Sequence, residues 1–123
     1  MKRELKNLIF VIMFFMLVLA KNSFANVTVS SATVTPTGSN QNGQYTIAFA
    51  TGNGTTNLIA GTSQIIITFN ASTYVPASIS ASLVTVNSTQ ATNVTVSGQV
   101  VTITTPVAIA KNGGTGTVVI SSS

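Results

Sequence analysis

Charged side chains are almost absent from this sequence after its first twenty-five residues. From Asn26 to Ser123 there is no Asp, Glu, His, Arg or Cys, and Lys111 is the only charged side chain. General acid–base catalysis uses His, Asp, Glu, Lys, Tyr or Cys, and a serine nucleophile needs a base beside it. This part of the chain offers only Lys111, Tyr45 and Tyr74 for such work. We therefore predict that the protein is not an enzyme.

The same missing residue types exclude several kinds of binding site. Zinc and other transition metals take His, Cys or carboxylate ligands, and calcium sites depend on carboxylates. Nucleic-acid binding needs clustered Lys and Arg. Without cysteine there is no disulfide, although an exported protein could form one. We predict no metal ion, no cofactor and no nucleic-acid partner.

Residues 1–25 have the order of a secretory signal peptide. A basic start, MKRELKN, precedes an apolar run from Leu8 to Ala20, and the small residues Ser23 and Ala25 follow it. The apolar run is shorter than the about 20 residues that a helix needs to cross a bilayer core of ~30 Å. We predict cleavage between Ala25 and Asn26, and a mature chain that is secreted or at the cell surface without a membrane span. An uncleaved membrane anchor is the alternative.

Residues 26–123 have the length of one domain, and their pattern is that of β-strands. Val and Ile alternate with Thr and Ser at period two, and no amphipathic helical pattern is longer than a turn or two. The apolar positions of the successive segments are Val27, Val29 and Val34; Tyr45, Ile47 and Phe49; Ile65, Ile67 and Phe69; Val84 and Val86; Val94 and Val96; Val101 and Ile103; Val118 and Ile120. This pattern predicts an all-β fold, an antiparallel immunoglobulin-like β-sandwich of about seven strands.

Turn residues separate these segments. Residues 93–96 and 100–104 read as a hairpin, with Ser97-Gly98 as its tight turn and Gly98 at positive φ. Pro106 ends the second strand because it cannot donate to the ladder. Asn53-Gly54 and Asn112-Gly113 predict two further turns.

The run from Thr73 to Ile120 resembles repeat modules of large bacterial and archaeal cell-surface proteins. The likeness lies in the order Val-Pro, Ile-Ser-Ala-Ser, Val-Thr-Val-Asn, Val-Ser-Gly-Gln, Val-Thr-Ile-Thr-x-Pro and an Ala/Gly-rich turn. The segments 45–49 and 65–69 fit as well. The resemblance implies an immunoglobulin-like stalk, scaffold or adhesion module, and it carries no catalytic residues. Such modules continue into a further strand beyond Ile120, so this module is truncated, complete in itself, or completed by a neighbouring subunit.

The expected function is therefore a structural or adhesive module at the cell surface. Its partners would be other copies of itself, other surface proteins or cell-surface components. The alternative is a self-assembling fibre subunit that exchanges strands, because Gln64–Phe69 (QIIITF) is uncharged, β-prone and free of proline. In the simpler interpretation, Ile65 and Ile67 of this segment fill the core of a folded monomer.

Ligand binding is a less favoured expectation. Carbohydrate platforms use exposed aromatic side chains, and Tyr74, beside a proline-bearing loop, is the one candidate. Thr33 and Thr35, spaced as Thr-x-Thr, would suit an ice-binding face but are typical of an ordinary outward strand face. Sequons mark candidate glycosylation sites at Asn26, Asn53, Asn70, Asn87 and Asn93.

Overall fold

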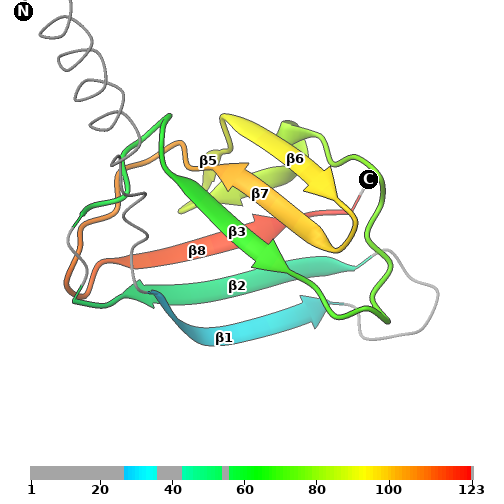
Figure 1. Ribbon diagram of the computed structural model, residues 1–123, viewed down its shortest axis with the longest axis horizontal. Coiled ribbons are helices and arrows are strands. Elements are labelled where there is room, and N and C mark those ends of the chain that lie inside the picture. The colour runs from blue at the N-terminus through cyan, green and yellow to red at the C-terminus, as the bar shows by residue number, and fades with distance from the viewer. Residues whose placement is uncertain (1–26, 36–42, 54–55, 123) are drawn as a thin grey trace, which may run out of the picture.

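The computed structural model describes residues 27–35, 43–53 and 56–122 (Figure 1). The predicted signal peptide, its cleavage site between Ala25 and Asn26, and Gly54 of the predicted Asn53-Gly54 turn lie outside the described residues. The described part forms an all-β domain of two antiparallel sheets. No helix within it is long and apolar enough to cross a membrane.

Five strands form one sheet and three form the other, and hydrogen-bonded neighbours run antiparallel throughout. The larger sheet has the order β1-β2-β8-β4-β5 and the smaller has the order β3-β7-β6. The strands are β1 (Val27–Thr35), β2 (Gln44–Thr51), β3 (Gln64–Thr68), β4 (Val84–Val86), β5 (Thr89–Gln90), β6 (Asn93–Ser97), β7 (Val100–Thr104) and β8 (Thr115–Ile120), and the 3-10 turn η1 (Ala81–Leu83) precedes β4.

Each segment predicted from the alternating pattern is a strand, and the structure adds one more. The additional strand is β5, which pairs with β4 through Thr89 and Gln90. Two residues are too few to show an alternating pattern, and both side chains are exposed. The expectation of about seven strands is therefore one too low for the described residues.

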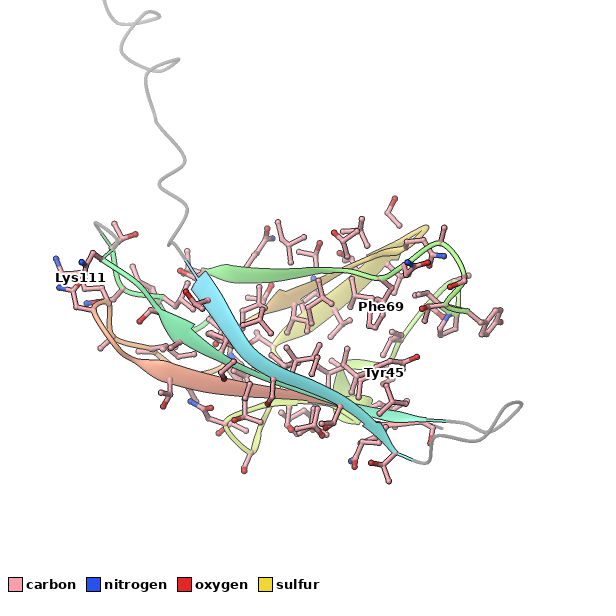
Figure 2. All side chains as sticks on the ribbon, turned by 90° about the horizontal axis from the view of Figure 1, so that it is seen from below. Tyr45, Phe69 and Lys111 are labelled. Atoms are coloured by element: carbon pink, nitrogen blue, oxygen red, sulfur yellow. The ribbon has the colours of Figure 1, made fainter. Side chains whose placement is uncertain are left out.

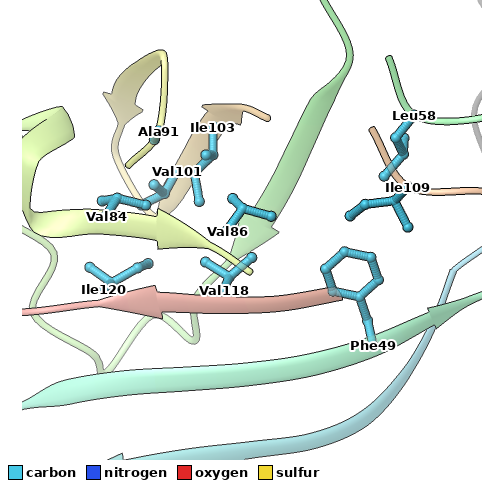
Figure 3. Packing of buried hydrophobic residues seen from close by; sticks show 10 residues of the cluster. All are labelled: Phe49, Leu58, Val84, Val86, Ala91, Val101, Ile103, Ile109, Val118 and Ile120. Atoms are coloured by element: carbon cyan, nitrogen blue, oxygen red, sulfur yellow. The ribbon is translucent and has the colours of Figure 1, made fainter. Parts of the chain in front are cut away.

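The core lies between the two sheets and consists almost wholly of branched aliphatic side chains (Figure 3). The strands β4, β7 and β8 bury alternate residues, as expected for sheets with one face on a core. Figure 1 shows β3 running diagonally across β8 and β2 of the other sheet. The buried hydrophobic residues are Phe49, Leu58, Val84, Val86, Ala91, Val101, Ile103, Ile109, Val118 and Ile120.

The predicted hairpin between β6 and β7 is present, but its turn is one residue further along. Ser97 still pairs with Val100 in the ladder, so the two turn residues are Gly98 and Gln99. Gly98 has φ +57°, as a tight hairpin that begins with glycine requires. The positive φ expected of Gly98 is confirmed, but the turn lies at Gly98-Gln99 because the register depends on how the two strands pair, which local residue types do not specify.

The turn between β4 and β5 uses two non-glycine residues at positive φ. Asn87 has φ +49° and Ser88 has φ +65°, the combination of a type I′ turn. The Asn87 side chain binds the neighbouring strand β8: its Oδ1 accepts from the Thr117 N–H at 2.8 Å, and its Nδ2 donates to the Thr115 carbonyl at 3.3 Å. Asn87 therefore fastens this turn to the centre of the five-stranded sheet.

Replacing Ser88 by glycine is expected to stabilise the protein by about 0.5 kcal/mol. A left-handed conformation costs an L-residue roughly 1–2 kcal/mol, and the entropy that glycine loses on folding offsets part of that gain. Urea unfolding monitored by circular dichroism would measure the difference. Ser97→Gly is the matched control: Ser97 lies in β6, where glycine is expected to destabilise. A Ser88→Gly variant less stable than the native chain would contradict the prediction.

Candidate functional site

The side chains that could ionise are few among the described residues, and they lie far from one another. Lys111 is exposed beside the turn at Asn112 and Gly113, both of which have positive φ, as the sequence predicted for that turn. The Lys111 backbone N–H donates to Asn57 Oδ1 at 2.9 Å. Figure 2 shows Lys111 at one end of the molecule, away from Tyr45 and Phe69. Among the described residues no group of three or more His, Cys, Asp or Glu side chains comes together.

Three of the aromatic side chains pack at the core, as their strand positions predicted. Phe49 is buried, and Tyr45 and Phe69 are partly buried against the core cluster. The Tyr45 and Phe69 rings meet edge to face, with centroids 5.1 Å apart, a favourable arrangement for an aromatic pair. All three are less exposed than Tyr74.

Tyr74 is 87% exposed and lies in a loop whose preceding residues are hydrogen-bonded to the β6–β7 turn. The Nε2 of Gln99, in the β6–β7 turn, donates to the carbonyls of Ala71 at 3.1 Å and Thr73 at 3.0 Å. Gln99 therefore anchors the residues just before Tyr74. The structure places this candidate platform on the surface, and carbohydrate binding there stays a prediction.

Four of the five candidate glycosylation asparagines lie among the described residues, and all four are exposed. They differ in what their side chains already bind. Asn70 Oδ1 accepts from the backbone N–H and the hydroxyl of Ser72, both at 2.9 Å, while Asn87 binds β8 as described above. Asn53 lies two residues beyond the end of β2, and Asn93 is the first residue of β6. Asn26 lies outside the described residues, and modification at any of the five stays a prediction.

The outer faces of both sheets carry hydroxyl and amide side chains without charge. On the three-stranded sheet, Thr102 lies opposite Ile66 and Thr95, and Thr104 lies opposite Gln64 and Asn93. On the five-stranded sheet, Thr33 pairs with Thr46, and Thr35 with Gln44. Threonine combines a branched Cβ suited to strands with a polar surface. These faces can form hydrogen bonds and van der Waals contacts, and they cannot form ion pairs.

The side of the sandwich formed by β1 and β3, here called the open side, departs from the sequence expectation. Val29, Ala32 and Val34 of β1 pair with Phe49, Ile47 and Tyr45 of β2, so they share the inward face. Their side chains are nevertheless exposed, by 59% for Val29 and 38% for Val34. The register shift between Val29 and Ser31 brings Val29 onto the same face as Ala32 and Val34, and no described strand of the smaller sheet covers that face. β3 is the edge strand of the smaller sheet on this side, and β6 is the other edge strand.

Comparison with known proteins adds no assignment. No family model matches the chain, and no curated protein or solved structure is significantly similar to it.

Proposed function

We propose that this chain is a non-enzymatic structural or adhesive module of immunoglobulin-like type, exported by its signal peptide to the cell surface. The observation that carries the proposal is the chemistry of the two sheet faces. They present mostly Thr, Ser, Asn and Gln, with Ile66 as an exposed aliphatic residue among them, over a largely aliphatic core, and Lys111 is the only charged side chain among the described residues. Such a surface acts by contact, because it offers hydrogen bonds and apolar area but no group that transfers protons or binds metal ions.

A second candidate function is a fibre subunit that assembles by strand exchange. The free edges of its strands favour this alternative. Proteins usually protect edge strands with Lys, Pro or charged side chains. β3 (QIIIT) is an edge strand of the described sheets and contains none of these residues. β1 (VTVSSATVT) is an edge strand that lacks them too, although its register shift between Val29 and Ser31 is a bulge of the kind that also protects edges.

Export and surface display can be tested on intact cells that produce the full chain with a C-terminal epitope. We expect added protease to remove the epitope from intact cells, and the mass of the recovered protein to correspond to a chain beginning at Asn26. Phe15→Arg, which interrupts the apolar run, is the control and should keep the chain inside. A native chain that stays in the cytoplasm with residues 1–25 attached would overturn the proposal.

Adhesion is tested with beads coated with the exported chain. Such beads should bind producing cells more than beads coated with heat-unfolded chain do. Equal binding by both kinds of bead would remove the adhesive role and leave the structural one.

The absence of titrating side chains gives a prediction for pH. Between pH 4 and pH 9 we expect the free energy of unfolding to change by less than about 1 kcal/mol. Stability depends on pH only through groups that bind protons differently when folded and unfolded, and carboxylates and histidine supply most of these. Residues 26–123 contain neither. Urea unfolding of the exported chain at several pH values measures this, and a larger loss of stability within the range would count against a fold that depends on apolar burial and ladder hydrogen bonds without ion pairs.

A further inference from the structure

We propose that the open side is a self-complementary interface on which a second copy of this chain docks, with β1 of each copy lying beside β3 of the other. The result is a closed dimer with a two-fold axis. This inference goes beyond the structural or adhesive role proposed above, which a monomer could also fulfil.

The edge of β3 that faces away from β7 has no neighbouring strand among the described residues. Two hydrogen bonds at the ends of the β3–β7 ladder set its alternation: Thr105 N–H donates to the Ser63 carbonyl at 3.0 Å, and Phe69 N–H donates to the Gln99 carbonyl at 2.8 Å. In an antiparallel ladder, successive residues direct their backbone groups to opposite sides. The N–H and C=O of Gln64, Ile66 and Thr68 therefore point away from β7 and toward solvent. An added strand would satisfy them.

The inward face of β1 lacks a cover on the same side of the molecule. β5 and β6 lie together at the opposite side, because the chain passes between them through only Ala91 and Thr92. This leaves β3 on the side of β1 and β2, in agreement with the contact between Tyr45 and Phe69. Figure 2, viewed from that side, shows β1 in the foreground together with β3. The five-stranded sheet thus extends past the outer edge of β3, and among the described residues no strand lies over the apolar face of β1, where Val29 and Val34 are exposed.

The larger sheet extends past β3 on one side, and this offset between the two sheets makes the open side complementary to itself. A two-fold axis running roughly along the strands, midway between the layers, exchanges the larger sheet of one copy with the smaller sheet of the other. β1 of the second copy then fills the place beside β3 and lies over the inward face of β1 of the first copy. Val29 and Val34 of the two copies cover each other, and both free edges gain a neighbour. Such an interface is isologous and closes on itself.

The offset between the two sheets also excludes a simpler dimer in which β3 pairs with β3 of the second copy. If β3 paired directly with β3 of a second copy, the two larger sheets would occupy the same space, because each extends beyond β3. Charge presents no obstacle to the staggered arrangement, since neither β1 nor β3 contains a charged residue. Like charges opposed across an interface are a common means of preventing self-association, and these strands have none.

Sedimentation velocity on the exported chain tests the proposal over a range of concentrations. We expect a reversible monomer–dimer equilibrium in the micromolar range without larger species. Val29→Lys places a charge on the covered face and should weaken the dimer at least tenfold. Thr28→Lys adds the same charge to the outer face of the same strand and should leave dimerisation unchanged. Val29 is 59% exposed in the single chain, so its substitution should not prevent folding.

Cross-linking locates the interface, and the natural lack of cysteine makes single-cysteine variants specific. Ala32 pairs with Ile47 on the inward face, and Ser31 pairs with Ala48 on the outer face. A short bis-maleimide should join two Ala32→Cys chains and leave Ser31→Cys chains separate. A monomer at every concentration, a dimer insensitive to Val29→Lys, or equal cross-linking of both variants would overturn the proposal. A ladder of larger species would also overturn it, in favour of the fibre, while none of these outcomes bears on surface export.

Discussion

The Gly116→Val variant is expected to lose about 3–4 kcal/mol of stability. No other substitution on the core-facing side of β8 is expected to cost as much. Gly116 pairs directly with Phe49 across β2 and β8, and the Phe49 ring covers it. A Cβ added at Gly116 would lie 2.6 Å from Cε1 and 2.8 Å from Cε2 of that ring, and closer still to Cζ. Phe49 is only 4% exposed, so the ring cannot move aside without opening the core.

Urea unfolding would measure this loss, with Thr117→Val as the control on the neighbouring, outward position of the same strand. The control should change stability by less than about 0.5 kcal/mol. The double variant Phe49→Leu/Gly116→Ala should be more stable than the sum of its single changes predicts, because the smaller side chain at 49 makes room for the Cβ. Additive effects would show that the ring and the glycine are not in contact.

Ile103→Ala is expected to destabilise the protein by about 2–5 kcal/mol. Ile103 is fully buried in β7, the central strand of the smaller sheet, and Figure 3 shows it between the sheets near Val101 and Ala91. Truncation to alanine removes apolar contacts and leaves a cavity that a ladder bonded on both sides cannot close. The reduced midpoint of urea unfolding gives the magnitude.

Two variants bracket the prediction for Ile103. Ile103→Val removes one methylene and should cost about 0.5–1.5 kcal/mol. Thr102→Ala changes the adjacent side chain, which lies on the outer face, and should cost less than about 1 kcal/mol. Equal losses for Ile103→Ala and Thr102→Ala would mean that β7 does not separate an inner face from an outer one, and the surface role of its threonines would lose its structural basis.

Strands were predicted correctly from the sequence where apolar and polar residues alternate over several positions. Tyr45, Ile47 and Phe49 face inward with the same period as Val101 and Ile103, because a strand directs successive side chains to opposite faces whatever lies around it. The same local rule explains what was missed. β5 is too short to alternate, and the register of the β6–β7 turn depends on a partner strand that the local sequence does not specify.

In the candidate site, too, some features could be predicted from the sequence and others could not. The lack of ionisable side chains and the position of Tyr74 beside Pro76 are readable in the sequence. The exposure of Val29 and Val34 is not readable from the sequence. They are five residues apart, and they share one face of β1 only because the register shifts between Val29 and Ser31. Only the unequal width of the two sheets leaves them uncovered. Likewise, Gln64–Phe69 was recognised as prone to pairing, but its position at a free edge depends on which strands flank it.

The sequence by itself determined the strand character of this protein, the placement of glycine and asparagine in its turns, and the uncharged chemistry of its surface, because each follows from residue type and local spacing. The tertiary structure alone decided which strands stand at the edges, that Gly116 lies beneath the Phe49 ring, and that one side of the sandwich is open. These features depend on pairing between segments far apart in the chain. Such pairing is set by how two sheets of different width pack around one shared core.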